Sequence, residues 1–291
     1  MQVGGVCANL ALRMEHSKVR VPATSANLGP GFDCLGVALD LHNYVTVRRG
    51  AAARPDRMVD EAADAFFAAA QCNRFDFAFE IDGDIPRSRG LGSSVAVRLG
   101  ILHALNALSG ARLDADQLYR LCAQLEGHPD NAAPAAFGGF TAARADGTYF
   151  RCAIDVGVRF VVLIPPAEID TESSRGRLPV VVPHADAVRN TAHASLIAAA
   201  FASRQYELLR GSMIDWLHQP YRSEAVPHLK PAIEAGVAAG ALGGYLSGSG
   251  SAVACITVDS PDAVAAAMHS VLPAAEVRIL GPDNRGVVLE A

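Results

Sequence analysis

The amino-acid sequence predicts an α+β fold with two domains. Segments with strand character and segments with helical spacing are mixed along the chain without a regular βαβ alternation, which favours α+β over a doubly wound parallel sheet. The length of 291 residues exceeds the size at which one hydrophobic core usually stops growing. The hydrophobic fraction of 51% is typical of packed globular domains. We place the domain boundary near Asp155 to Pro166, which gives an N-terminal domain of residues 18–160 and a C-terminal domain of residues 161–291.

The first half of the chain begins with strand-like segments. A short strand is expected at residues 19–21, and Pro22 should end it because proline cannot donate to a strand ladder. A turn-rich stretch follows, and strand character returns over residues 36–47. Alanines and phenylalanines at helical spacing predict a helix over residues 59–72. The clearest strand covers residues 75–81, where apolar and polar side chains alternate with a period of two.

Two helices are expected in the middle of the chain. The first begins directly after Ser94 and carries one apolar stripe. The second begins at Asp114, a favourable N-cap, and Gly127 and Pro129 end it, which leaves Glu126 on its last turn.

The second half continues the mixture of helices and strands. An apolar strand is expected over residues 159–164, and an alanine-rich helix over residues 185–210. A strand at residues 252–258 leads into a helix with Ser260 as N-cap and proline at its first position. A last strand is expected over residues 276–280.

Composition excludes several function classes. The net charge is −5, and only Lys18 and Lys230 are lysines among 25 basic residues, so nucleic acid is not an expected partner. No apolar run is long enough for a membrane span. The six cysteines are widely spaced, which argues against a zinc site or a disulfide framework and for free thiols in the cytoplasm. Residues 1–13 are interpreted as a disordered extension, with Met14 as the alternative start.

A glycine- and serine-rich loop, Gly90 to Ser94, lies directly before the first of the two middle helices. Glycines allow close approach of the backbone to a ligand, and the helix N-terminus favours a phosphate. An ordinary glycine turn capped by serine is the alternative. The loop is not a lysine-containing P-loop, so a phosphate here would depend on backbone amides and a metal. Two further glycine loops, residues 248–251 and 29–31, each adjoin a predicted element end, as a backbone-lined pocket requires.

Four segments resemble one family in order along the chain. Residues 19–39 (VRVPATSANLGPGFDCLGVAL) look like the opening motif of homoserine kinases, which are members of the GHMP small-molecule kinase superfamily. Residues 85–97 (IPRSRGLGSSVAV) resemble the phosphate loop of that superfamily, and residues 126–139 (EGHPDNAAPAAFGG) the next block in its homoserine-kinase form. Residues 246–252 (LSGSGSA) resemble the third motif.

The resemblance implies a fold and a cofactor site. The N-terminal domain should resemble a ribosomal-protein-S5-like fold and the C-terminal domain a ferredoxin-like fold, with the active site in the cleft. ATP should lie in this cleft, and Mg²⁺ should be held by Ser94 and Glu126. The residues implied to bind ATP are Pro86, Arg89, Gly90, Leu91, Gly92, Ser93 and Ser94.

The resemblance also implies a substrate site for L-homoserine. Asp33 is the expected partner of the ammonium group, and Arg175 and Arg222 are the expected clamp on the carboxylate, for which the guanidinium fork is suited. The other residues implied to bind substrate are Asn27, His128, Asn131, Thr171 and Gly248. His128 has an alternative role as a cap on the preceding helix.

The resemblance leaves the proton transfer open. Sister families carry an aspartate where Asn131 stands here, with Asp130 beside it. Homoserine kinases are thought to work by orientation and charge stabilisation without a protein base, which a loose phosphoryl-transfer transition state permits. The expected catalytic set is therefore Asn131, Glu126 and Ser94.

The expected activity is ATP- and Mg²⁺-dependent phosphorylation of L-homoserine on the route to threonine. There are two alternatives. One is another GHMP-type kinase that acts on a different alcohol, and the other is a non-catalytic relative that binds ATP or a metabolite. The sequence does not determine the oligomeric state; a homodimer is one possible assembly, because dimers are common among such kinases and C2 dimers are the commonest symmetric assembly.

Overall fold

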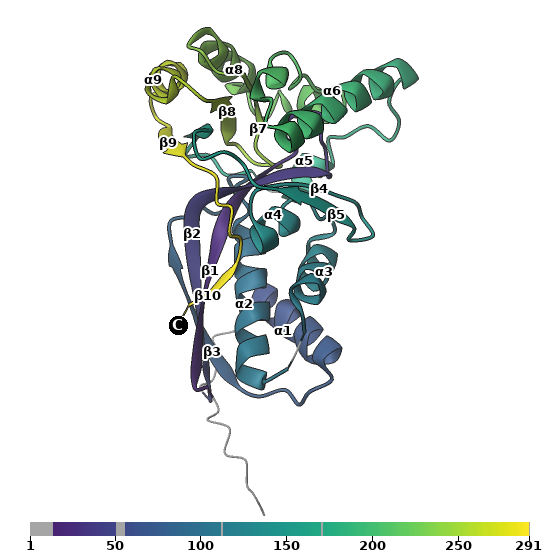
Figure 1. The fold of residues 1–291 in the computed structure, drawn as a ribbon, viewed down its shortest axis with the longest axis vertical. Coiled ribbons are helices and arrows are strands. Elements are labelled where there is room, and N and C mark those ends of the chain that lie inside the picture. The colour runs from purple at the N-terminus through teal and green to yellow at the C-terminus, as the bar shows by residue number, and fades with distance from the viewer. Residues whose placement is uncertain (1–13, 51–55, 112, 170, 291) are drawn as a thin grey trace, which may run out of the picture.

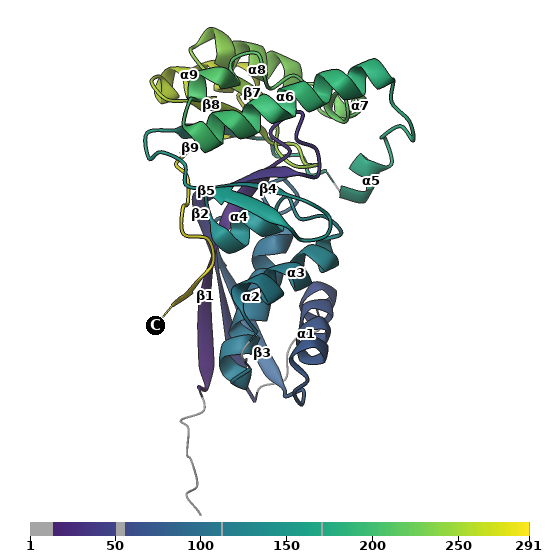
Figure 2. The same ribbon diagram turned by 45° about the vertical axis from the view of Figure 1, so that its right-hand side comes forward.

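The computed structural model describes residues 14–50, 56–111, 113–169 and 171–290. The predicted extension of residues 1–13 lies outside the described residues. The α+β architecture is confirmed: helices pack on two separate antiparallel sheets that lie one above the other along the long axis of the molecule (Figures 1 and 2).

The first sheet is built around two long antiparallel strands, and its strand order is β10-β1-β2-β4-β5, with β3 paired to β2. Its strands are β1 (His16–Ala26), β2 (Leu35–Arg49), β3 (Phe77–Gly83), β4 (Phe140–Ala143), β5 (Tyr149–Cys152) and β10 (Val288–Glu290). The prediction that Pro22 ends the first strand is wrong. β1 continues to Ala26, because the register with β2 shifts between Pro22 and Ala23, a position where a strand tolerates a residue without an N–H group.

Four helices pack with this sheet: α1 (Arg57–Ala70), α2 (Ser93–Ser109), α3 (Ala115–Glu126) and α4 (Ala132–Phe137). The buried helix α2 lies against β1 and β2 with Leu99 and Leu102 in the core. The predicted start of α3 is confirmed, because the Asp114 side chain accepts from the Gln117 N–H and Gln117 bonds back in a capping box. Helix α4 is an element that the sequence analysis did not predict.

The second sheet has the order β7-β8-β6-β9, and all its strands except the edge strand β9 are buried on both faces. Its strands are β6 (Arg159–Ile164), β7 (Gly243–Leu246), β8 (Val253–Thr257) and β9 (Glu276–Leu280). On β6, Val161 and Leu163 pack under α8 (Leu229–Ala238) and α9 (Pro261–Val271). Phe160 and Val162 point into the core that the second sheet shares with the first.

Helix α6 (His184–Ser203) crosses the face of the second sheet opposite α8 and α9 (Figure 2). Its Phe201 stacks on Phe140 of β4, with ring centroids 4.5 Å apart, and so joins the two sheets. The helix is shorter than predicted, because Arg204 adopts a left-handed φ of 58° and a short 3₁₀ turn follows at Tyr206–Leu209. Two short helices, α5 (Thr171–Arg175) and α7 (Gln219–Arg222), approach the site described below.

The end of the chain returns to the first sheet. Residues 276–280 form a strand as predicted, but they are not the last strand, because β10 pairs antiparallel with β1. Asp283 anchors this return: its carboxylate lies 2.7 Å from an Arg20 nitrogen and 2.8 Å from the His42 ring. The division into domains of residues 18–160 and 161–291 stays a prediction. The strand β10 does not follow this division, because it belongs to the C-terminal range in sequence but pairs within the first sheet.

Asp283→Asn is expected to lower stability in a pH-dependent way. Burial opposes the charged carboxylate, but hydrogen bonds from His42, from the Gly286 and Arg285 N–H groups and from Arg20 lower the pKa of Asp283 to about 2. Because the pKa of Asp283 is lower in the folded protein than its ordinary value of 3.8, the ionised carboxylate stabilises the fold at pH values above 3.8. This stabilisation is lost as the pH falls towards the pKa of the folded state. The contribution is on the order of 2 kcal/mol.

The test is urea unfolding of both proteins as a function of pH. We expect the variant to have the lower free energy of unfolding at neutral pH, and the gap to close as pH falls from about 4 to about 2. An unchanged gap across that window would contradict the role given to Asp283.

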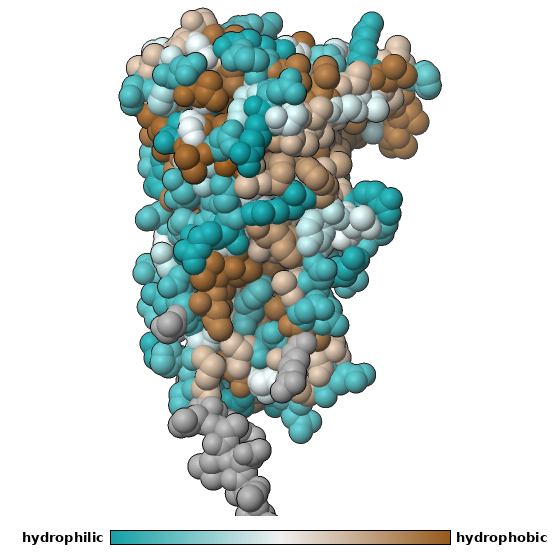
Figure 3. Space-filling view, viewed as in Figure 1, coloured by the Kyte–Doolittle hydropathy of each residue, from teal (hydrophilic) through white to brown (hydrophobic). Residues whose placement is uncertain are grey.

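Hydrophobic surface gathers at the N-terminal end of α6 (Figure 3). Val180, Val181 and Val188 are exposed in this region. Within the described residues, no helix is long and apolar enough to cross a bilayer. The homodimer stays a prediction.

Candidate active site

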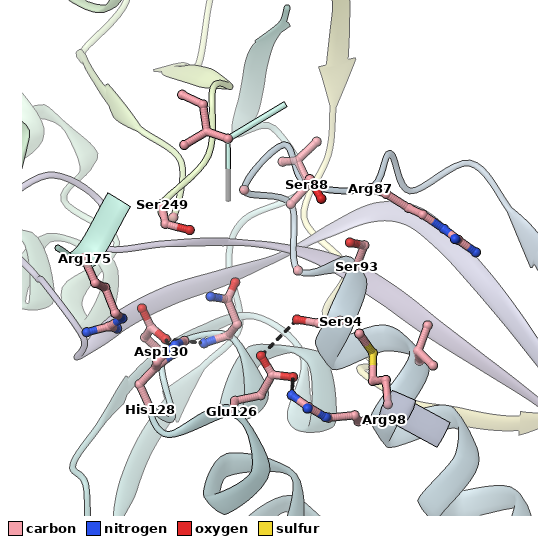
Figure 4. Close-up of a pocket in the computed structure, with 18 of the residues that line it drawn as sticks. Arg87, Ser88, Ser93, Ser94, Arg98, Glu126, His128, Asp130, Arg175 and Ser249 are labelled. Carbon is pink, nitrogen blue, oxygen red and sulfur yellow. Dashed lines mark hydrogen bonds and ion pairs between the residues drawn. The ribbon is translucent and has the colours of Figure 1, made fainter. Parts of the chain in front are cut away.

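A cavity of about 480 Å³ lies where the two sheets meet. It is lined by the loop before α2, by the end of α3 and its following loop, and by segments that lead to the second sheet (Figure 4). The predicted site residues that line it are Asn27, Asp33, Gly90, Leu91, Gly92, Ser93, Ser94, Glu126, His128, Asn131, Arg175, Arg222 and Gly248.

The loop before α2 requires glycine at two positions. Gly90 and Gly92 have φ values of +78° and +70°, in the left-handed region that favours glycine. A Cβ on Gly90 would lie 2.0 Å from the Ser247 carbonyl oxygen, and one on Gly92 would lie 2.0 Å from Thr24 Oγ1. No side chain caps α2, and its first turn holds no acidic residue. The N-terminal N–H groups of α2 are therefore available to an anion in the cavity.

The motif at residues 246–252, which holds the predicted glycine loop 248–251, packs directly on the loop before α2. Ser247 Oγ donates to the Gly90 carbonyl at 2.7 Å, and the Ala252 N–H donates to the Arg89 carbonyl. The opening segment joins them, because Asn27 Nδ2 donates to the Gly248 carbonyl at 2.9 Å. Segments far apart in sequence thus form one backbone-lined wall. Arg89 does not line the cavity, and its Nε donates to the Pro165 carbonyl at 2.8 Å.

A pair of oxygen donors lies beside the start of α2. Ser94 Oγ donates to Glu126 Oε2 at 2.9 Å, and Arg98 donates to Glu126 Oε1 at 2.5 Å (Figure 4). Arg98 also donates to Glu61 of α1 at 2.9 Å, so its charge is shared between two carboxylates. One hydroxyl and one carboxylate oxygen at a phosphate-accepting loop are the donor types that Mg²⁺ prefers. The residues present therefore fit a magnesium ion.

The part of the site that holds Asp33, Arg175 and Arg222 contains both negative and positive side chains. Arg175 binds Asp33 through two parallel hydrogen bonds of 2.6 and 3.0 Å. The Arg222 side chain is buried, and among the described residues no carboxylate lies within ion-pair distance of it. Burial, with the nearby charge of Arg175, lowers the pKa of Arg222 to about 10. A buried guanidinium without a direct carboxylate partner attracts an anionic ligand.

The loop after α3 is ordered by Asp130, which is buried. Its Oδ1 accepts from the Asn131 N–H at 2.9 Å and lies 2.8 Å from His128 Nδ1. Burial opposes the charged imidazole, but this hydrogen bond and the Asp130 charge raise the pKa of His128. Asn131 Oδ1 accepts from Thr24 Oγ1 at 2.7 Å. His128 therefore lines the cavity and contacts Asp130, while Gly127 forms the C-cap of α3.

Comparison with known proteins identifies the family. Residues 57–139 match the GHMP kinases N terminal domain, and residues 187–274 match the GHMP kinases C terminal domain. A homoserine kinase of Thermus thermophilus is 40% identical over 84% of this chain and 87% of its own length. A homoserine kinase of Clostridium botulinum is 34% identical over 94% of this chain and 98% of its own.

The chain belongs to the GHMP kinases. A crystal structure of homoserine kinase from Cytophaga hutchinsonii has the same fold, with a TM-score of 0.86 over 100% of both chains at 24% identity.

In this GHMP kinase, three predicted site residues are not among those that line the cavity. Pro86 and Arg89 do not line it, although Arg87, Ser88 and Gly90 do, and the side chain of Thr171 lies outside the described residues. Three further residues carry no prediction from the sequence: Arg98 and Glu61, described above, and His218, whose Nδ1 lies 3.0 Å from Arg222 Nη1. A signal existed for Arg98, which stands four residues after Ser94 and therefore shares its helix face. Glu61 and His218 carry no such local signal.

Proposed function

We propose that this chain transfers the γ-phosphoryl group of ATP to the side-chain hydroxyl of L-homoserine, giving O-phospho-L-homoserine and ADP in threonine biosynthesis. The relatives that share 34–40% identity with it are named homoserine kinases. The observation that carries the proposal is the charged end of the cavity. Asp33 suits an ammonium group, and Arg175 and Arg222 suit a carboxylate. A sugar or mevalonate-like alcohol offers no ammonium group to Asp33, which is paired with Arg175 in this structure.

ATP would occupy the part of the cavity beside α2. Its phosphates would accept hydrogen bonds from the backbone N–H groups after Gly92, aided by the positive end of the helix dipole. Met58, Ile81 and Val97 contribute apolar side chains to the same cavity and suit the base. Arg87 and Arg98 add positive charge in a chain that holds only two lysines.

Ser94 and Glu126 would hold Mg²⁺, which when bound neutralises charge on the β- and γ-phosphates. Arg98 orients the Glu126 carboxylate so that Oε2 faces the Ser94 hydroxyl. The Arg98 charge is shared with Glu61, so Glu126 keeps negative charge for the cation.

The hydroxyl of homoserine would be oriented by Asn131, whose amide is fixed by Thr24. A loose transition state needs little activation of the nucleophile, so correct placement supplies most of the catalysis at this atom. Asp130 already accepts from Asn131 and His128, which gives it a role in holding the loop.

Asn131→Ala is expected to lower kcat about 10- to 100-fold, because the acceptor hydroxyl loses its orienting group. Asp130→Asn should keep most of the activity, because an amide oxygen can still accept from the Asn131 N–H. Steady-state ADP release at saturating substrates measures both. An inactive but folded Asp130→Asn enzyme would instead assign Asp130 as the base.

The proposed function is tested by ADP release from Mg²⁺-ATP with a panel of alcohols: L-homoserine, L-serine, L-threonine, mevalonate, galactose and shikimate. We expect turnover that depends on L-homoserine. Turnover with an alcohol that lacks the ammonium and carboxylate groups would assign a different GHMP-type activity. ATP binding without turnover on any alcohol would identify a non-catalytic relative.

A further inference from the structure

His218 lies directly behind the substrate-facing arginine and is fully buried. Its ring stacks on Phe32 with the centroids 5.0 Å apart. Its backbone is fixed by Asp215, whose carboxylate accepts from the N–H groups of Leu217, His218 and Gln219. The ring thus has one fixed position at the start of α7.

Both ring nitrogens of His218 have defined partners. Nε2 lies 2.8 Å from the Gly29 carbonyl oxygen, and Nδ1 lies 3.0 Å from Arg222 Nη1. A carbonyl oxygen only accepts, so the proton of the neutral ring belongs on Nε2. Nδ1 therefore presents its lone pair to the guanidinium and accepts from it.

All the other acceptors of Arg222 in the described structure are also uncharged. Nη1 donates to the Gly248 carbonyl at 3.3 Å, and Nε donates to the Ser174 carbonyl at 3.5 Å. A carboxylate in the place of the imidazole would orient the guanidinium but would also neutralise it. A neutral ring orients it and leaves its charge for a ligand.

The surroundings keep the ring neutral. Burial lowers the pKa of His218, and the adjacent Arg222 lowers it further, against the charges of Asp215 and Asp33 and the hydrogen bond with the Gly29 carbonyl, which raise it. Asp215 Oδ2 lies 3.5 Å from Nε2 and is occupied by backbone N–H groups.

We propose that His218 is a positioning residue that holds the Arg222 guanidinium towards the carboxylate of the amino-acid substrate without neutralising it. This inference rests on the proposed function, in which Arg222 binds that carboxylate. It identifies a determinant of substrate selectivity that does not itself touch the substrate.

The test compares two nearly isosteric variants, His218→Asn and His218→Asp, which differ in charge. The readout is the ratio of kcat/KM for L-homoserine to kcat/KM for 2-amino-1,4-butanediol, in which CH₂OH replaces the carboxylate. We expect His218→Asn to keep this ratio within about 5-fold of the original protein, and His218→Asp to lower it about 30-fold or more, with KM for ATP unchanged in both. Equal ratios in the two variants would overturn the inference and leave a packing role.

A second measurement needs no variant. The ¹⁵N NMR signals of the His218 ring in the unaltered protein are expected to show a neutral ring with the proton on Nε2 at pH 7. A proton on Nδ1, or a charged ring, would overturn the inference even if both variants failed to fold. If the unaltered protein itself shows no preference for L-homoserine over the diol, the proposed function and the inference both fail.

Discussion

Glu126→Gln is expected to lower kcat about a thousandfold or more, a loss of about 4 kcal/mol in transition-state stabilisation. Glu126 offers one oxygen to the Ser94 hydroxyl and the other to Arg98. The amide has nearly the same shape but is uncharged and is a poor ligand for a hard cation. The measurement is steady-state ADP release at saturating ATP, Mg²⁺ and L-homoserine, with circular dichroism to verify that the variant is folded.

Glu61→Gln is the matched control for this experiment. Glu61 is the second carboxylate partner of Arg98, but it is not one of the two oxygen donors at the loop. We expect it to change kcat less than about 10-fold, because the ion pair is partly exposed and the donor pair is intact. If Glu126→Gln kept more than a tenth of kcat with an unchanged dependence on Mg²⁺, the metal role of Glu126 would be wrong.

Arg222→Met is expected to raise KM for L-homoserine about 100-fold while KM for ATP stays nearly constant. Arg222 is buried at the charged end of the cavity and has no carboxylate partner among the described residues. Methionine fills similar volume without the charge, so the variant removes the expected anchor of the carboxylate. Initial rates with each substrate varied in turn measure the two constants.

Arg222→Lys is the control that separates charge from geometry. Lysine keeps the positive charge but lacks the planar fork, so we expect an intermediate rise in KM of about 10-fold. The methionine variant should also lose the preference for L-homoserine over 2-amino-1,4-butanediol. If it loses activity equally on both compounds, Arg222 supports the structure and does not read the carboxylate.

Local patterns predicted much of the fold. The alternation in residues 75–81 predicts β3, which lies two residues later at Phe77–Gly83. The apolar run at residues 159–164 corresponds to β6, and the Asp114 cap to the start of α3. In each of these segments the signal lies within a few neighbouring residues, and packing agrees with it.

The elements that sequence reasoning missed depend on contacts between distant segments. β10 has three residues and exists because it pairs with β1, some 270 positions earlier in the chain. Helix α4 contains Pro134, which reads as a helix breaker but is tolerated because it lies in the first turn. Pro22 likewise predicts the end of a strand. Only the pairing of β1 with β2 shows that the register shifts between Pro22 and Ala23 and that the strand continues.

The residues of the candidate site also fall into two groups, those with a local sequence signal and those without one. Its glycine loops and the residues Ser94 and Glu126 stand in recognisable motifs, so their convergence could be expected. The contacts of Arg98 with Glu61 and of His218 with Gly29 join residues 37 and 189 positions apart. No local pattern encodes such pairs, because they arise only when the helices and loops have packed.

The product expected of this chain is O-phospho-L-homoserine. The most direct test is ³¹P NMR of a mixture of the protein, Mg²⁺-ATP and L-homoserine. We predict a phosphomonoester signal that grows in equal proportion to ADP, couples to the methylene protons of the acceptor carbon, and is absent with Glu126→Gln. ADP accompanied only by inorganic phosphate, or no reaction with L-homoserine while another alcohol is phosphorylated, would contradict the account.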